Sequence, residues 1–360
     1  MHSPESVGLE HLAAWSDAYR SPNARKRLDA IRSIAPQFKR DFVRRPPVVA
    51  VRTLDVSKAP YPVTYAFNRA CTLPYPYLLF QNRALVVQFE QRGTTKILLM
   101  NPTIPDRSAR APFFADLARS MPFSKFVQQR FLESPPVHVQ LERIGLRPDD
   151  IDYVAFDHQH VQDLRPYLGT PGTRKLYPKA KYLVQRHDWD ASLDLHPLQR
   201  PWFVADSAER VNSEDVILLD GDYQLGDGIA LIATPGHTYG NQSLMFRAPE
   251  SGSYTVSENG ICMDAYAPEA SRIAGLAAHA RRTGDEVVLN GNTLENALDQ
   301  YNSMVKEKLL ADPWPRDPRF VQHFSSSELI PSIAAPGLRA THEIVGVNEG
   351  TFRLSDRATT

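Results

Sequence analysis

The chain has 360 residues, of which 42% are hydrophobic, so it is long enough to bury a full core without stabilising cross-links. Its 41 basic and 41 acidic side chains give a formal net charge of zero, which argues against bulk electrostatic binding to nucleic acid or to a membrane surface. Two cysteines, an N-terminus without a signal-peptide pattern and the lack of any apolar run of about 18 residues predict a cytoplasmic protein without disulfides or a membrane span.

The first 80 residues differ from the rest of the chain in their composition and in the spacing of their apolar side chains. Over residues 1–43, apolar side chains such as Leu28 and Ile31 recur at helical spacing. Residues 44–80 are rich in proline and aromatic side chains, and the prolines exclude a long helix. We therefore expect an N-terminal helical and extended arm over residues 1–80, which serves as a lid, as a partner surface or simply as packing.

Residues 81–345 have the pattern of one α/β domain. The segments RALVVQFEQ and KILLMNP indicate two buried strands joined by a turn at Arg92 and Gly93. Further strand segments, among them IDYVAFDH, ALIATPGH and SYTVSENGICMDAY, are interspersed with helical segments. This mixture favours an α/β arrangement, and residues 346–360 are expected to form a C-terminal tail.

Polar metal-binding side chains follow three of these predicted strands. His158 and His160 are separated by one residue in FDHQHVQD, so that both imidazoles can turn toward one point. His237 follows a Pro-Gly turn in ATPGHT, and Asp264 follows the apolar run ICM. A single HxH or PGH is weak evidence, but their combination at successive strand ends is stronger. Imidazole and carboxylate suit a borderline metal such as Zn²⁺, so the four side chains are candidate ligands of one site.

Several of these segments resemble the metallo-β-lactamase superfamily, on the branch that includes lactonase-like and glyoxalase-like hydrolases. TPGHTYGNQS is close to that family's TPGHTPGHQS, and LRPDDIDYVAFDHQH resembles the approach to its metal loop. ICMDAY is similar to the segment that carries its bridging aspartate. The resemblance covers residues 83 to about 300 and implies an αββα sandwich with the metal site at one edge of the two sheets. It also implies Zn as the usual metal, with Fe or Mn as alternatives.

The chain departs from the family at the second metal position. The family pattern HxHxDH reads HQHVQD here, so Gln162 and Asp163 replace an aspartate and a histidine that bind the second metal in relatives. Asn292 stands in place of the last family histidine. These departures favour one metal per chain over two. They also make Asp163 the candidate to orient or deprotonate a metal-bound water, or to serve as a substitute metal ligand. Its alternative role is to cap the LRPYLG turn that follows it.

The sequence therefore predicts a metal-dependent hydrolase that uses a metal-bound hydroxide on an ester, lactone, amide or activated ether bond of a small, apolar substrate. One alternative is a catalytically weak or silent subunit that partners an active paralogue, and another is an iron-dependent oxygen or redox enzyme. A homo-oligomer or hetero-oligomer with a related subunit is expected, without nucleic acid or membrane partners. Additional candidates are Tyr239 and Tyr266 as oxyanion donors, and His323 and His342 as displaced ligands.

Overall fold

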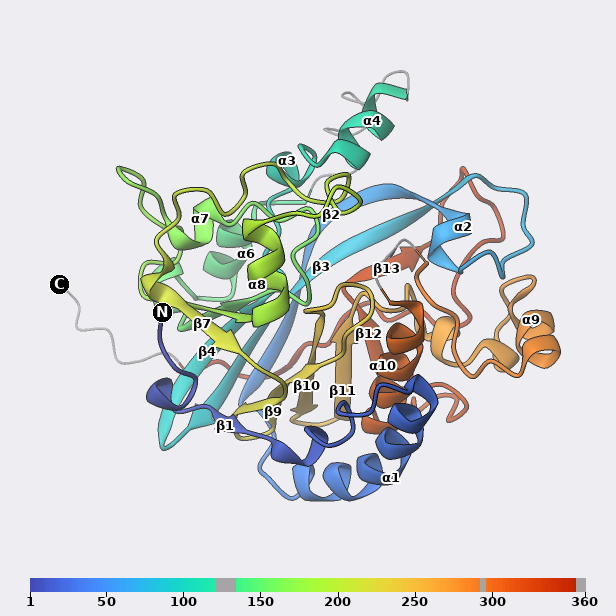
Figure 1. Ribbon diagram of the computed structural model, residues 1–360, viewed down its shortest axis with the longest axis horizontal. Coiled ribbons are helices and arrows are strands. Elements are labelled where there is room, and N and C mark those ends of the chain that lie inside the picture. The colour runs from blue at the N-terminus through green and yellow to red at the C-terminus, as the bar shows by residue number, and fades with distance from the viewer. Residues whose placement is uncertain (121–133, 292–295, 354–360) are drawn as a thin grey trace.

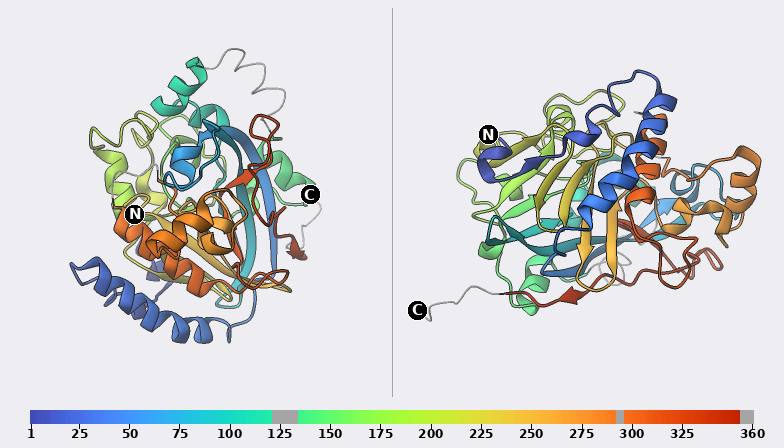
Figure 2. Two further views of the ribbon diagram at one scale, coloured as in Figure 1. Left: turned by 90° about the vertical axis from the view of Figure 1, so that its right-hand side faces the viewer. Right: turned by 90° about the horizontal axis from the view of Figure 1, so that it is seen from below.

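The centre of the molecule consists of two β-sheets that pack face to face, with helices on their outer faces (Figures 1 and 2). The computed structural model describes residues 1–120, 134–291 and 296–353. The first sheet has the order β1-β8-β9-β10-β11-β12, formed by Glu10–His11, Tyr223–Gly226, Ile229–Ala233, Gln242–Ala248, Gly252–Ser257 and His323–Ser325. The second has the order β14-β2-β3-β4-β5-β6-β7, formed by Glu349–Gly350, Ala50–Pro62, Tyr77–Gln91, Thr94–Met100, Tyr153–Ala155, Lys181–Gln185 and Val216–Leu219.

The loops that follow β4 and β5 lie at the same edge of the second sheet, because these two strands are parallel. Strands β4, β5, β6 and β7 run parallel, whereas β2, β3 and β4 are antiparallel neighbours. A short strand β13 (Ser327–Ile330) pairs with β3. The predicted hairpin between β3 and β4 is confirmed, and it turns at Arg92 and Gly93, which both have positive φ. The carboxyl ends of β4 and β5 therefore meet at the same edge.

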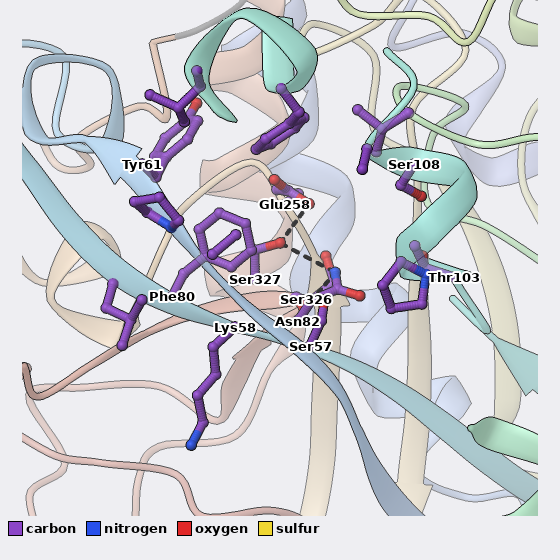
Figure 3. A pocket seen from close by; sticks show the side chains of 18 of the residues that line it. Ser57, Lys58, Tyr61, Phe80, Asn82, Thr103, Ser108, Glu258, Ser326 and Ser327 are labelled. Atoms are coloured by element: carbon purple, nitrogen blue, oxygen red, sulfur yellow. Dashed lines mark hydrogen bonds between the residues drawn. The ribbon is translucent and has the colours of Figure 1, made fainter. Parts of the chain in front are cut away.

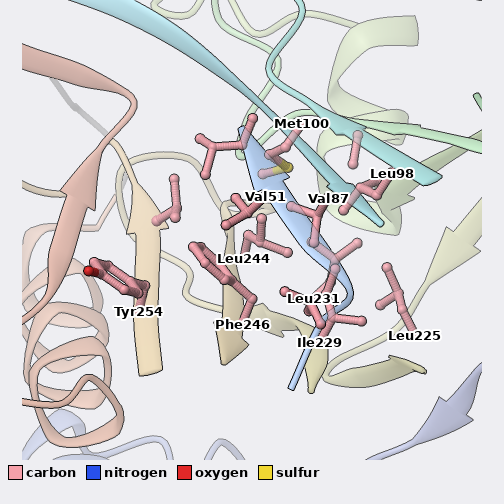
Figure 4. Close-up of a cluster of buried hydrophobic side chains, with 14 of the residues drawn as sticks. Val51, Val87, Leu98, Met100, Leu225, Ile229, Leu231, Leu244, Phe246 and Tyr254 are labelled. Atoms are coloured by element: carbon pink, nitrogen blue, oxygen red, sulfur yellow. The ribbon is translucent and has the colours of Figure 1, made fainter. Parts of the chain in front are cut away.

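The period-two alternation of each strand explains why the sheets form two layers. In β4, Leu98 and Met100 face the core between the sheets, while Ile97 and Leu99 face the helices outside. Strands β3 and β9 alternate in the same way. The core between the sheets includes the side chains labelled in Figure 4, Val51, Val87, Leu98, Met100, Leu225, Ile229, Leu231, Leu244, Phe246 and Tyr254.

Helices cover both outer faces. Helices α1 (Ala24–Phe42) and α10 (Ala297–Leu310) lie on the first sheet, where Trp15 and Ile31 pack against Ile232. The face of the second sheet is covered by α6, α7 and α8, formed by Val137–Arg143, Arg165–Leu168 and Arg186–Leu193. The remaining described helices are α2, α3, α4 and α9, formed by Val63–Ala66, Pro105–Ser108, Pro112–Ser120 and Leu276–Thr283. This arrangement confirms the expected α/β class with an αββα sandwich.

None of the helices in the described ranges combines the length and the apolar character that a membrane span needs.

The N-terminal 80 residues do not form a separate arm, which corrects the predicted division of the chain. Strand β1 pairs with β8, and β2 pairs with β3 from Ala50 to Pro62. A boundary at residue 80 would cut β3 in two. Strand β14 likewise joins the expected C-terminal tail to β2. The prolines excluded a long helix correctly, since only the short α2 occurs in residues 44–80. Pro60 and Pro62 are tolerated in β2 because the two-residue β14 does not extend along that part of its outer edge.

Candidate metal centre

The structure brings His158, His160 and His237 together at one edge of the sandwich. One ligand atom from each ring lies within 4.8 Å of the others, and the ring centroids are 4.6 to 5.2 Å apart. All three side chains are buried. The first two follow β5 of the second sheet, and the third follows β9 of the first sheet. The cluster therefore joins loops from both layers.

Asp157, which the sequence analysis did not single out, orients His158. Its Oδ1 lies 2.8 Å from Nδ1 of His158 and also accepts the backbone N–H of that residue at 2.9 Å. Asp157 is held in turn by Ser326, whose hydroxyl donates to Oδ2 at 2.5 Å, and by Asn101, whose Oδ1 accepts the Asp157 N–H at 2.9 Å. A carboxylate on Nδ1 leaves Nε2 as the metal-binding nitrogen, as in many metal sites.

The pKa values of the three imidazole rings are shifted in different directions. Burial alone would lower the pKa of His158, but the charge and hydrogen bond of Asp157 raise that pKa to about 9. Burial and the neighbouring charge of His158 lower the pKa of His160 and of His237 well below the ordinary value. The latter two imidazoles are therefore neutral at pH 7, which is the form that coordinates a metal.

Unpartnered nitrogens test whether this cluster suits a metal ion. Both ring nitrogens of His237 and Nδ1 of His160 are buried and have no hydrogen-bond partner within the described residues. An unsatisfied buried polar atom costs about 1–3 kcal/mol, and proteins rarely leave one without a partner. Coordination would satisfy one nitrogen of each ring. Three converging imidazoles, two of them neutral, therefore fit a zinc-type ion.

Helix α10 supports the loop that carries His237. Gly236 has a φ of 139°, and a Cβ on it would lie 2.1 Å from the backbone nitrogen of Gln300. Ser303 donates its hydroxyl hydrogen to the carbonyl oxygen of Pro235 at 2.7 Å. Only glycine permits this close approach of loop and helix. The Pro-Gly turn therefore fixes the position of His237 relative to α10.

Asp264 does not belong to either of the two groups of potential metal ligands that the described residues form. Its Oδ1 accepts the hydroxyls of Ser271 and Thr341, each at 2.5 Å, and its Oδ2 accepts the Thr341 backbone N–H at 2.9 Å. Strand β11 ends at Ser257, and Asp264 lies in the short 3₁₀ segment Met263–Tyr266. The predicted position of Asp264 at a strand end is therefore wrong, because the buried run ICM is not part of the strand.

Glu258 occupies the position that had been expected for Asp264. It directly follows β11, and together with Asp157 and His158 it forms the second group of potential ligands, again within 4.8 Å. Burial raises the pKa of Glu258 to about 7, against the lowering effect of His158, and the hydroxyl of Ser327 donates to its Oε2 at 3.0 Å. The Asn-Gly pair after Glu258 is a turn signal that could have placed the strand end correctly.

Asp163 is held by arginines. Arg165 donates to both of its carboxylate oxygens, at 2.7 and 2.9 Å, and Arg107 donates to Oδ2 at 2.7 Å. Burial would raise the pKa of Asp163, but these hydrogen bonds outweigh that effect and lower it. The neighbouring Gln162 donates to the hydroxyl of Thr103 at 3.0 Å. This geometry favours a structural role for Asp163 over that of a base; Asn292 lies outside the described residues.

We expect Asp163→Asn to lower the free energy of unfolding by about 1–3 kcal/mol, because it weakens hydrogen bonds with two guanidinium groups. The metal content per chain should stay unchanged. Urea unfolding and elemental analysis measure the two quantities. A variant that keeps both its metal and its stability but loses more than about 100-fold in hydrolysis would restore the prediction that Asp163 is a general base.

The other candidates from the sequence lie in different surroundings. The hydroxyl of Tyr266 donates to Glu307 at 2.6 Å, and its ring stacks on His323 at 3.9 Å. The imidazole of His342 lies 3.2 Å from a carboxylate oxygen near the surface. Tyr239 is exposed. The partners of Tyr266 and His342 lie apart from the histidine cluster, which suits a packing role for Tyr266 and a surface position for His342.

A cavity of about 680 Å³ borders the cluster. His158, His160 and Glu258 form part of its wall, and Figure 3 shows Glu258 among the side chains around it. Much of the remaining wall is apolar and comes from β2, β3 and α4, including Pro60, Tyr61, Leu78, Phe80, Phe114 and Leu117. The site thus combines a polar corner with a larger apolar space, as small-molecule sites commonly do.

Aromatic side chains extend this wall beside the histidines. The ring of Trp202 lies 6.0 Å from that of His160 and stacks on Phe113 at 4.3 Å. Tyr65 contacts both Trp202 and Phe113. These rings form an apolar surface next to the histidines. Polar groups of a ligand would be poorly accommodated against this surface.

No family model matches the chain. Curated relatives include an N-acyl homoserine lactonase from Bacillus thuringiensis, 28% identical over 113 residues, and the N-acyl homoserine lactonase AttM from Rhizobium radiobacter, 31% identical over 122 residues. Each match covers 31% of this chain, and 40% and 42% of the relative, so the chain spans about two fifths of the length of the curated relatives it matches.

Solved structures resemble the chain over a greater length. A variant of AiiA from B. thuringiensis with N-decanoyl-L-homoserine bound has a TM-score of 0.51 at 17% identity, covering 78% of this chain and 94% of that one. A probable metal-dependent hydrolase from Staphylococcus aureus has a TM-score of 0.50 at 13% identity, covering 72% and 83%. Likeness at these identities concerns the fold. The two central sheets and their helical layers thus give the chain the same αββα fold as these solved structures.

Proposed function

We propose that the protein is a metal-dependent hydrolase that cleaves an ester or lactone bond in a small substrate with a sizeable apolar part. The observation that carries this proposal is the group of three buried histidines beside a mainly apolar cavity of about 680 Å³. His158 and His160 line the cavity, and His160 and His237 have unpartnered ring nitrogens. The N-acyl homoserine lactonases among the relatives support the reaction class. Amide and activated ether bonds are further candidates for the same chemistry.

His158, His160 and His237 would hold one metal ion, and Glu258, rather than Asp264, is a carboxylate beside them. Such an ion, when bound, polarises a scissile carbonyl group and lowers the pKa of a coordinated water. The chain's own residues prepare this site. Asp157 fixes the ring of His158, and Ser327 orients Glu258. The apolar walls would bind the apolar part of the substrate and keep bulk water away from the reacting bond.

The altered second position supports one metal per chain. Gln162 is hydrogen-bonded to Thr103, and Asp163 is engaged by Arg107 and Arg165. The same alterations motivate the alternative of a silent subunit that partners an active paralogue. The unpartnered nitrogens of the histidine cluster favour the hydrolase, because a subunit that binds no metal would bear their desolvation cost without any benefit.

We expect elemental analysis after metal-replete expression to find about one transition metal per chain, by the ligand count. In hydrolysis assays with N-acyl homoserine lactones and p-nitrophenyl esters of increasing acyl length, kcat/KM should rise by up to about fourfold per methylene, since burial of each contributes about 0.8 kcal/mol. The rise should stop when the chain fills the cavity. Metal-free protein, prepared with a chelator, is the control.

The outcomes of this experiment separate the two functions. Bound metal without turnover of any of these substrates would keep the metal centre but contradict the proposed ester or lactone substrate. Absence of metal would contradict both the metal centre and the hydrolase, and it would favour the silent subunit. Turnover that is insensitive to acyl length would agree with a hydrolase but contradict the proposal that the apolar cavity binds the substrate.

A further inference from the structure

Asp188 lies where the two histidine-bearing loops meet. Its carboxylate, in the first turn of α8, is almost completely buried. Oδ2 accepts the backbone N–H of Gln159 at 2.9 Å, and Oδ1 accepts that of Gly240 at 3.1 Å. Gln159 separates His158 from His160, and Gly240 lies three residues after His237. One carboxylate therefore binds the backbone of both loops, each within three residues of a histidine of the cluster.

The contact on the second loop requires a glycine. A Cβ on Gly240 would lie 2.3 Å from the backbone nitrogen of Asp188 and 2.7 Å from both Cβ and Oδ1 of its side chain. Distances of this size are well below van der Waals contact, so any other residue would push the loop away from α8. The close contact between α8 and this loop therefore depends on two residues, Asp188 and Gly240.

The charge of Asp188 is not explained by an ion pair. No lysine or arginine of the described residues lies within 4.0 Å of its carboxylate. A buried carboxylate without a lysine or arginine partner is costly, and the backbone N–H donors and the nearby His158 offset only part of that cost. The position at the start of α8 adds a modest favourable term from the helix dipole. A residue kept at such a cost is better explained by what it positions than by the stability it provides.

We propose that Asp188 is a positioning residue of the metal centre, which fixes the spacing between the two histidine loops and thereby sets the affinity for the metal. This inference rests on the proposed metal site at His158, His160 and His237. It does not depend on which bond the protein hydrolyses. Asp188 acts through backbone groups, so it neither touches the metal nor takes part in proton transfer.

The test compares Zn²⁺ affinity among three variants by competition with a chelating dye. Asp188→Asn keeps the size of the side chain but turns an N–H₂ group toward one of the two N–H donors, and Gly240→Ala displaces the same contact without a change of charge. Both are expected to weaken Zn²⁺ binding by about 10- to 100-fold, the usual range for groups that orient metal ligands. The absorption spectrum of bound Co²⁺ should change as well.

Asp264→Asn is the matched control. Asp264 is also a buried carboxylate that accepts a backbone N–H, but its partners are Ser271 and Thr341. Its replacement should lower stability and leave Zn²⁺ affinity within about threefold of the original protein. Hydrogen exchange gives a readout without metal, because the amides of Gln159 and Gly240 should exchange faster in Asp188→Asn and not in Asp264→Asn.

Two results would overturn the inference. One is Zn²⁺ affinity and amide exchange in Asp188→Asn that match the original protein. The other is an equal loss of affinity in Asp264→Asn, since the effect would then follow from general destabilisation. Failure of the proposed function is distinct: a protein that binds Zn²⁺ with the expected ranking of variants but hydrolyses no ester or lactone would retain the role of Asp188.

Discussion

Replacement of His237 by alanine is expected to abolish stoichiometric metal binding and to lower hydrolysis by at least about 1000-fold, because it removes one of three metal ligands. The fold should persist. Both ring nitrogens of His237 lack a hydrogen-bond partner among the described residues, so truncation leaves no new unsatisfied group behind. Elemental analysis, turnover and circular dichroism of the purified variant measure the three effects.

His323→Ala is the control for this experiment. His323 is equally buried, but its Nδ1 lies 3.1 Å from the hydroxyl of Thr255 and its ring stacks on Tyr266, apart from the cluster. It should lose stability and keep its metal. If His237→Ala binds metal as the original protein does, the assignment of the ligands is wrong.

The largest loss of stability is expected for Lys306→Met. The ammonium group of Lys306 is fully buried on α10, 2.6 Å from Asp222 Oδ1, 3.0 Å from the carbonyl oxygen of Ala233 and 4.3 Å from the ring of Trp15. Removal of the cation leaves the Asp222 carboxylate buried without its partner, which costs about 3–5 kcal/mol. Urea unfolding followed by fluorescence measures this difference.

The double variant Lys306→Met, Asp222→Asn separates the two contributions to this cost. It removes the uncompensated charge, so it should recover most of the lost free energy of unfolding. A single variant that loses less than about 1 kcal/mol would mean that Asp222 is protonated or hydrated in the folded protein, and that the ion pair contributes little.

The sequence predicted the main parts of the site because they depend on local patterns. Apolar runs that end in FDHQH and ATPGH placed three histidines at the ends of strands, and the mixture of strands and helices indicated an α/β arrangement. The structure brings these histidines within 4.8 Å of one another. Local patterns sufficed because each histidine directly follows a buried segment, whose end fixes the position of the loop.

The carboxylates were harder to predict for a physical reason. Burial does not distinguish a strand from a packed coil, so the apolar run before Asp264 resembled a strand and Glu258 was passed over. The surroundings of Asp163 depend on Arg107, which is 56 residues away in the chain. Long-range contacts of this kind, like the pairing of β2 with β3, leave no periodic trace in a single sequence.

The position of helix α4 determines which substitutions the cavity can accept. It projects from the sandwich (Figure 1), yet Phe114 and Leu117 form part of the cavity wall. The histidine loops, in contrast, are anchored in the two sheets and on α8 and α10. Substitutions on α4 can therefore reshape the apolar space at little cost to the folded core. Substitutions in this helix would therefore alter the shape of the cavity while the histidine cluster stays unchanged.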